Sequence, residues 1–253
     1  MVAAPRLLSL VLAGALTLGL SGAASPADPR RAALVLWAWD RPEDLRFAQP
    51  GDEVAAVVGV ITLSGEAVVA RGRTVALKLP PGVRRTAVVH VEIDPHNPAA
   101  WTPRQRAAAA AAVLAYSDLG WEAAQVDFEV RASQRPILLD LLTDVRAGLP
   151  SGQRLSMTAL ASWCDTEQWM SQAPVDEVVP MLFRMGPGGQ GLRRRLEAGG
   201  DLREPRCRAA MGMAVDQPLS RLPPGRRLYL FNPRPWSQPA LDETRARIAA
   251  WRN

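Results

Sequence analysis

Eight short apolar segments follow one another along the chain, and most of them are followed by a segment with helical features. Strands that alternate with helices in this way form parallel sheets. Eight such units in a chain of 253 residues predict a (β/α)8 barrel of the TIM type, with a doubly wound open sheet as the alternative. The predicted strands span residues 33–39, 54–63, 86–93, 124–130, 155–161, 177–183, 209–215 and 227–231.

The predicted barrel is irregular after its second strand. Residues 54–63 and 68–79 are both rich in valine and are joined by Ser64-Gly65-Glu66-Ala67. This pattern indicates a β-hairpin excursion in place of a helix. After the third strand, Thr102 and Gln105 form a capping box around Pro103, so a helix is expected to begin there.

The N-terminus has the features of a secretory signal peptide. Arg6 supplies a positive charge, residues 7–20 are apolar or small, and small residues follow at positions 21–24. The apolar run is shorter than the roughly 20 residues of a membrane-spanning helix, which makes a retained anchor helix the less favoured alternative. We predict a signal peptide over residues 1–24 and a single barrel domain over residues 25–253. The mature protein is expected in the periplasm or outside the cell, without a stable membrane span.

The charge of the chain does not indicate a nucleic-acid partner. Thirty basic and 25 acidic residues give a formal net charge of +5, but the arginines are scattered over separate segments and Lys78 is the single lysine. A nucleic-acid-binding face would gather basic side chains on one element with aromatic partners. We therefore expect no nucleic acid to bind, and the sequence indicates no oligomeric state.

Polar and aromatic residues come directly after the predicted strands. The active site of a (β/α)8 barrel lies at the carboxyl ends of its strands. Carboxylates, tryptophans and an arginine that converge there are residue types used in sugar cleavage, so the expected partner is a carbohydrate. The alternative is that they are surface residues, helix caps and core tryptophans. The candidate substrate-binding residues are Asp40, Glu92, Asp94, Trp163, Arg184, Asp216 and Trp236.

Asp127 and Glu129 on the fourth predicted strand are the candidate catalytic residues. Because side chains alternate along a strand, Val126 and Phe128 would pack outward under the helices and the two carboxylates would point into the barrel. Neighbouring like charges raise the pKa of one carboxyl group, which produces a general acid at neutral pH. The alternative is a structural pair neutralised by a nearby arginine, at position 131 or 135.

We expect Glu129 to be the acid and Asp127 to modulate it. The best second carboxylate is expected to be Glu92 or Asp40, because each comes near the end of another predicted strand.

The segment around these residues resembles a motif of chitinases and related endo-N-acetylglucosaminidases. The sequence Glu122-Ala-Ala-Gln-Val-Asp-Phe-Glu129 is similar to their fourth-strand motif, which ends in Asp-x-Glu, and Met181-Leu-Phe-Arg184 is similar to their sixth-strand Met-x-Tyr-Asp. The resemblance implies that Glu129 is the acid and that Asp127 supports an acetamido group of the substrate. Three positions depart from the pattern, and they carry Gln125, Phe183 and Arg184. These departures weaken a mechanism in which the substrate assists.

A second resemblance covers most of the mature chain. Three segments are similar to an uncharacterised bacterial family, the domain of unknown function 3142. They are residues 37–45 (WAWDRPEDL), 158–164 (TALASWC) and 179–186 (VPMLFRMG). This resemblance implies an exported barrel protein and implies no activity.

A metal site is an alternative use of the third strand. His90, Glu92, Asp94 and His96 alternate, so all four could share a face, but on a strand they would span about 20 Å, too far to chelate one ion. A turn at Pro95 could bring Asp94 and His96 together. We predict no metal and no other cofactor, and we interpret His90 as a histidine of the barrel core.

Three functions from different classes are consistent with these residues. The first is a glycoside-hydrolase-like enzyme that acts on an extracellular or envelope polysaccharide by carboxylate acid/base catalysis. The second is a non-catalytic barrel that binds glycan. The third is a metal-dependent hydrolase that uses Asp94 and His96.

The two cysteines are predicted to be free, buried thiols. Export favours a disulfide. The predicted topology, however, places Cys164 after the fifth strand and Cys207 before the seventh, at opposite ends of the barrel. A strand of six residues separates these ends by about 20 Å, whereas bridged Cα atoms lie within about 7 Å of each other.

Overall fold

The structure is a computed structural model, which describes residue 1 and residues 34–167, 169–186 and 188–250. The predicted signal peptide therefore lies outside the described residues, apart from Met1. The described residues from Leu34 onward form one compact unit. Within them, no helix has both the length and the apolar character that a membrane span requires.

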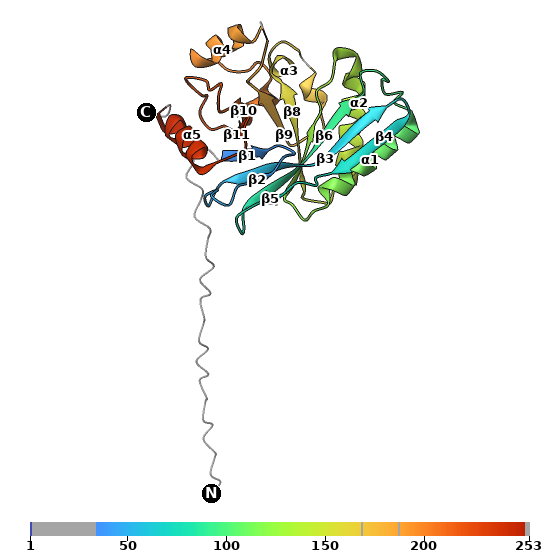
Figure 1. Cartoon of the computed structure of the whole chain (residues 1–253), viewed down its shortest axis with the longest axis horizontal. Helices are drawn as coiled ribbons and strands as arrows, with labels where there is room; N and C mark the ends of the chain where they lie inside the picture. Colours follow the sequence, from blue (N-terminus) through green and yellow to red (C-terminus); the bar gives the residue numbers. More distant parts are fainter. Residues whose placement is uncertain (2–33, 168, 187, 251–253) are drawn as a thin grey trace. The chain divides into compact units, whose positions relative to one another are not determined.

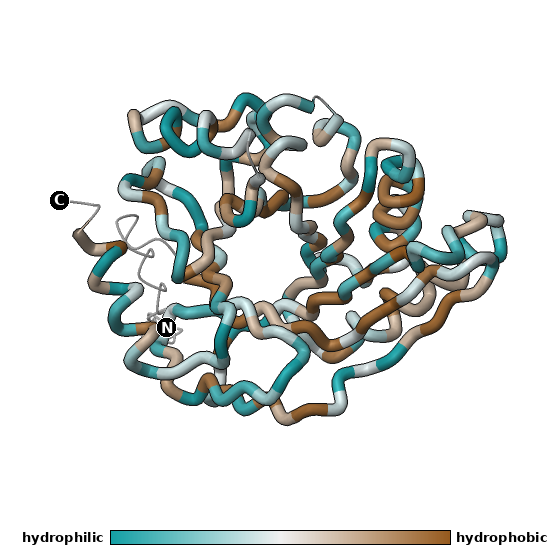
Figure 2. The backbone as a smooth tube through the Cα atoms, turned by 45° about the horizontal axis from the view of Figure 1, so that its top comes forward, coloured by the Kyte–Doolittle hydropathy of each residue, from teal (hydrophilic) through white to brown (hydrophobic). Residues whose placement is uncertain are grey.

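Eight parallel strands close into a barrel, as predicted. The first strand pairs with both the second and the last strand of the barrel, so no edge is left open. Figure 2 shows the strands as a closed ring with the helices outside it. The open-sheet alternative is therefore wrong. In chain order the barrel strands are β1 (Leu34–Ala38), β3 (Glu53–Ser64), β6 (Arg84–Ile93), β7 (Ala123–Asp127), β8 (Arg154–Leu160), β9 (Glu177–Met181), β10 (Ala210–Ala214) and β11 (Arg227–Phe231).

The predicted hairpin excursion is present after the second barrel strand. Strand β4 (Ala67–Gly72) runs antiparallel to β3 and pairs with its second half, residues 59–64, beside which it lies in Figure 1. Gly65 adopts a positive φ of 55° in the turn between them, which glycine tolerates without strain. The chain then returns through β5 (Leu77–Lys78), which pairs with β2 (Glu43–Asp44).

Helices cover the barrel unevenly. Helix α1 begins at the predicted capping box, where Thr102 Oγ1 accepts the N–H of Gln105 at 3.2 Å. Helix α3 begins directly at the end of β8. The α-helices are α1 (Pro103–Ser117), α2 (Arg135–Gly148), α3 (Ala161–Asp165), α4 (Gly189–Glu197) and α5 (Gln238–Ala250), and the 3-10 helices are η1 (Ala132–Gln134), η2 (Met170–Gln172) and η3 (Pro205–Arg208).

Two apolar layers form the core. The outer layer, between strands and helices, contains Val126 and Phe128 as predicted, both essentially fully buried. The barrel interior holds a separate cluster that includes Trp37, Tyr229 and Phe231. Burial of each such large side chain stabilises the fold by about 1.5–3 kcal/mol.

The barrel interior also contains polar contacts that hold its strands in register. Trp37 Nε1 donates to Gln125 Oε1 at 2.9 Å, and Gln125 Nε2 donates to Ser156 Oγ at 3.1 Å. These bonds join β1, β7 and β8 below the mouth. Gln125 is fully buried and is therefore part of the interior rather than the mouth.

Cys164 and Cys207 form a disulfide, so the prediction of free thiols is wrong. Their Cα atoms are 5.8 Å apart. The error lies in the placement of Cys164, because α3 turns from the rim onto the outside of the barrel, where Cys164 is buried in the outer apolar layer. The short helix η3 brings Cys207 into the same layer, and the N–H of Glu204 donates to the carbonyl of Cys164 at 3.0 Å.

Candidate functional site

A cavity of about 630 Å³ opens at the carboxyl ends of the strands. Its volume lies within the range of about 300–1,000 Å³ that is usual for small-molecule sites. Of the nine sequence-predicted site residues, it brings together Asp127, Glu129, Arg184 and Asp216. It also contains residues that the sequence did not indicate, among them His90, Trp39 and Phe183.

Asp127 is fixed at the end of β7 by two neighbouring strands. Its Oδ2 lies 2.8 Å from His90 Nδ1 on β6, and its Oδ1 accepts a hydrogen bond of 2.5 Å from Thr158 Oγ1 on β8. The residue is 6% exposed. Because both oxygens are bonded, the carboxylate has one defined orientation. Its hydrogen-bond partners are His90 and Thr158 and not the arginines at positions 131 and 135.

Glu129 lies two residues beyond Asp127 and lines the same cavity. Strand β7 ends at Asp127, three residues earlier than predicted, but both carboxylates still face the mouth. Glu129 is exposed to solvent on one side. The cavity walls nevertheless remove part of its hydration, which raises its pKa, and the charge of Asp127 raises that pKa further while His90 lowers it. A raised pKa is the property that a general acid needs near neutral pH.

His90 forms the third member of this group. Its hydrogen bond to Asp127 raises the pKa of the imidazole, burial opposes that shift, and the charges of Asp127, Glu92 and Glu129 add to it. Its side chain is 35% exposed and lines the cavity. The prediction of a core histidine is therefore wrong, because residue 90 lies in register with Asp127 at the mouth, above the interior layer that contains Val88.

Aromatic rings form the opposite side of the cavity. Trp39 follows β1, Phe183 follows β9, and Phe231 ends β11. The rings of Phe183 and Phe231 lie 4.8 Å apart, and those of Trp39 and Phe231 lie 6.3 Å apart. The cavity therefore has a charged side on β6 and β7 and an apolar side that can cover a ring-shaped ligand.

Arg184 and Asp216 line the cavity near its exposed edge. Arg184 has a positive φ of 51°, which is strained for a residue with a side chain, and its N–H donates to Gln217 Oε1 at 3.1 Å. Non-glycine residues in such a conformation are concentrated at functional sites. The structure thus supports the placement of both residues at the mouth.

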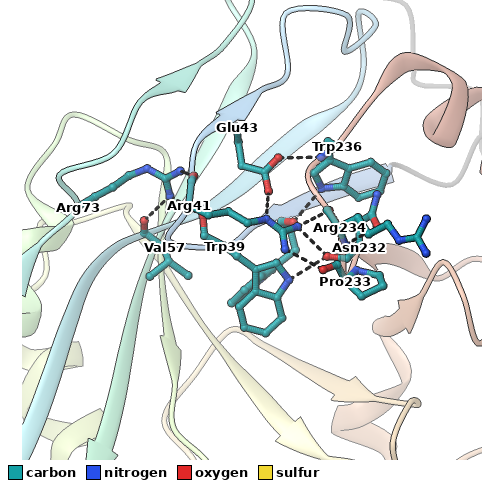
Figure 3. A network of polar contacts seen from close by, with 10 residues as sticks. Trp39, Arg41, Glu43, Val57, Arg73, Asn232, Pro233, Arg234 and Trp236 are labelled. Atoms are coloured by element: carbon teal, nitrogen blue, oxygen red, sulfur yellow. Dashed lines mark hydrogen bonds and ion pairs between the residues drawn. The ribbon is translucent and has the colours of Figure 1, made fainter.

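A hydrogen-bond network joins the segments that follow β1, β4 and β11 and holds the aromatic side of the mouth (Figure 3). The guanidinium of Arg41 bonds Glu43 Oε1 at 2.7 Å and the carbonyls of Asn232 and Pro233 at 3.0 and 2.9 Å. Trp39 Nε1 donates to the same Asn232 carbonyl at 3.1 Å. The network replaces a helix between the first two barrel strands and fixes Trp39.

Two of the predicted tryptophans do not reach the cavity. Trp163 is 2% exposed and packs against Trp169 in the outer layer, with ring centroids 4.9 Å apart. Trp236 is 5% exposed, and its Nε1 donates to the carbonyl of Trp37 at 3.0 Å. Both are core residues, so their placement as substrate platforms is wrong. Trp236 belongs to the network of Figure 3.

Three predicted carboxylates also lie outside the cavity lining. Asp40 pairs with Arg71 on β4, and Glu92 accepts a hydrogen bond of 2.8 Å from Thr62 Oγ1. Asp94 accepts from Ser64 Oγ at 2.8 Å and from the N–H of His96 at 2.9 Å, and these bonds hold its pKa below the usual value. All three side chains are bonded to residues of the β3–β4 hairpin, so neither Asp40 nor Glu92 is the second carboxylate of the mouth.

The arrangement of Asp94 and His96 does not favour a metal centre. The Asp94 carboxylate already accepts a hydrogen bond from the backbone N–H of His96, in the turn that follows it. In the described part of the chain, no group of three or more His, Cys, Asp or Glu side chains is arranged to hold a metal ion.

Asp165 is a cavity residue that the sequence placed after the fifth strand without assigning it a role. It lines the cavity wall, where it is ion-paired with Arg195 of α4. Because this ion pair joins α3 to α4, Asp165 connects the wall to the outer helices.

The fold and the cavity together define a (β/α)8 barrel protein whose mouth has two carboxylates and a histidine facing aromatic rings. No family model matches the sequence, and no curated protein sequence is significantly similar to it. Among solved structures, the chain is similar to the spore cortex-lytic enzyme SleL of Bacillus cereus, with 16% identity and a TM-score of 0.44. The alignment covers 73% of this chain and 51% of the SleL chain, so this chain spans about half the length of that protein. A similarity of this size carries no information about activity.

Proposed function

We propose that the protein is a glycoside-hydrolase-like enzyme that acts on an extracellular or envelope polysaccharide. The observation that carries this proposal is the placement of Asp127 and Glu129 in one cavity. Asp127 is bonded on both oxygens, whereas Glu129 has no such bond to the described residues and its pKa is raised. Two carboxylates in different environments divide into a group that stays charged and a group that carries a proton.

In the proposed reaction, Glu129 gives its proton to the glycosidic oxygen as the bond from that oxygen to the sugar breaks. The sugar carbon becomes positively charged, and the Asp127 carboxylate stabilises that charge. Water then adds to the sugar carbon and returns one proton to Glu129, which restores the enzyme. Trp39, Phe183 and Phe231 would cover the sugar ring, and Arg184 and Asp216 would contact its polar groups or a neighbouring sugar.

A non-catalytic glycan-binding barrel is the second candidate. Glu92 and Asp40 do not reach the cavity, and Asp165 is paired with Arg195. Asp216 is therefore the one exposed acidic residue besides Glu129 in the described lining. The aromatic side would bind sugar whether or not hydrolysis follows.

We also propose that the protein is exported to the periplasm or secreted, after cleavage of residues 1–24, and that it is a member of the family with domain of unknown function 3142. The Cys164–Cys207 disulfide supports export, because disulfides persist in oxidising compartments. Mass spectrometry of the protein from the culture medium and periplasm tests cleavage after residue 24.

One paired screen distinguishes the two candidates. The wild-type protein is incubated with a panel of bacterial and plant polysaccharides, and new reducing ends are measured. A glycan array with the same protein measures binding. Hydrolysis that is lost in Glu129→Gln supports the enzyme. Binding on the array without new reducing ends supports the binding barrel. If the protein neither hydrolyses nor binds any glycan, both candidates are contradicted.

A further inference from the structure

The charged side of the cavity contains one titratable base, His90, beside two acids, and a third acid lies near it outside the cavity lining. Asp127 and Glu129 face it from β7, and Glu92 lies two residues ahead on its own strand. The neighbouring strand β3 presents Val60 in register with His90, and β8 presents the Thr158 hydroxyl to Asp127. Two carboxylates this close would repel each other if both were charged and no cation lay beside them.

The contact geometry makes His90 the direct partner of only one of these acids. Its Nδ1 lies 2.8 Å from Asp127 Oδ2. The other ring nitrogen has no hydrogen-bond partner in the described residues, and the ring is partly exposed in the cavity. Asp127 therefore accepts a hydrogen bond that becomes stronger when the imidazole is protonated, whereas Glu129 interacts with His90 only through the charge of the imidazole.

We propose that His90 is a positioning residue of this site, which holds Asp127 in one orientation through its Nδ1 and places a positive charge beside the two carboxylates. This inference rests on the proposed function, since it assigns His90 a part in the same reaction. The chain has two histidines, and the other one, His96, lies in an exposed turn.

His90→Asn separates the two parts of this role. An asparagine amide can still donate to Asp127 Oδ2, so the orientation of the carboxylate is retained, but the positive charge is lost. Because His90 lowers the pKa of Glu129, its removal is expected to raise that pKa. His90→Ala loses both the bond and the charge. His96→Asn is the matched control, because it removes the other histidine and leaves the cavity unchanged.

The experiment is an NMR titration of the Glu129 carboxyl carbon in the wild-type protein, His90→Asn and His96→Asn, with the signal assigned by its loss in Glu129→Gln. The expected result is a titration midpoint at higher pH in His90→Asn and an unchanged midpoint in His96→Asn. An unchanged or lower midpoint in His90→Asn would overturn the proposal. If an enzyme substrate is found, the basic limb of the pH–rate profile should move to higher pH in the same variant.

A reciprocal measurement keeps the test decisive if His90→Asn does not fold. In Asp127→Asn the side chain remains the same size, and the His90 imidazole should then titrate at lower pH than in the wild-type protein, while His96 is unaffected. A His90 titration that does not move would contradict the proposal. Neither titration needs a substrate, so failure to find a hydrolysed glycan would count against the proposed function and not against this role of His90.

Discussion

His90 Nδ1 and Asp127 Oδ2 lie 2.8 Å apart at the mouth of the barrel, on the neighbouring strands β6 and β7. The register of these strands places His90 beside Asp127, and the hydrogen bond raises the pKa of the imidazole. The pair therefore links the protonation of the His90 imidazole to the stability of the fold.

This link predicts a pH-dependent contribution of His90 to stability. A histidine whose pKa is raised in the folded state contributes stability that is fully present below its unfolded pKa of about 6.5 and is lost as the pH rises through the folded pKa. The loss of unfolding free energy caused by His90→Asn should therefore be larger at about pH 6 than at about pH 9. Urea denaturation at both pH values measures it. Equal losses would show that the charge of His90 does not contribute.

Glu129→Gln is expected to stabilise the protein slightly at neutral pH. Partial burial raises the pKa of Glu129, which means that its ionised form is less favourable in the folded than in the unfolded protein. At a pH above the pKa of Glu129 in the unfolded protein, the ionised carboxylate therefore lowers the free energy of unfolding. The neutral amide of glutamine removes this destabilisation. We expect a gain below about 1 kcal/mol, because the group is exposed on one side. Thermal unfolding at about pH 7 and pH 4 measures it, and a gain that is larger at the acid pH would contradict this explanation.

The network of Figure 3 predicts a large loss of stability when Glu43, which is not one of the candidate catalytic carboxylates, is replaced. The Glu43 carboxylate is fully buried and binds both Arg41 and the N–H of Trp236. Glu43→Ala leaves these groups without partners and should cost about 2–4 kcal/mol. Asp44→Ala is the control, because the pair of Asp44 with Arg46 is exposed to solvent, so its loss should lower stability much less than the loss of Glu43. Equal losses in the two variants, measured by urea denaturation, would contradict this role of Glu43.

The disulfide predicts a fourth effect on stability. The Cys164–Cys207 bond closes a loop of 43 residues that contains β9, α4 and η3. Its removal in the double variant Cys164→Ser, Cys207→Ser should lower the unfolding free energy by about 2–4 kcal/mol. Thiol titration of the denatured, unreduced wild-type protein should detect no reactive thiol. Two reactive thiols would show that the bond is not formed in the isolated protein.

Much of the barrel could be predicted from the sequence because its signals are local. The apolar strand segments, the turn at Gly65 and the cap at Thr102 each depend on a few neighbouring residues, and the structure has all of them. The disulfide could not be predicted in this way, because it depends on the path of α3 across the outside of the barrel. That path is determined by packing between segments that are distant in the sequence.

The candidate site was predictable only in part, for the same reason. The alternation Val126-Asp127-Phe128-Glu129 is local and correctly indicates two carboxylates at the mouth. Alternation along β6 also turns His90 to the inner face of the barrel, but the sequence does not fix the register between β6 and β7 that makes Asp127 its partner. Trp163 and Trp236 follow strands as cavity residues do, yet the loops fold back and bury them.

The most direct test of the central claim compares hydrolysis by three proteins on whichever polysaccharide the screen identifies. Glu129→Gln removes the proposed proton donor and keeps its size, and Glu66→Gln makes the same change in the exposed hairpin turn outside the cavity lining. The rate constant kcat should fall about 100- to 10,000-fold in Glu129→Gln and should be unchanged in Glu66→Gln. Hydrolysis by Glu129→Gln at the wild-type rate would show that Glu129 is not the acid and would contradict this account of the site.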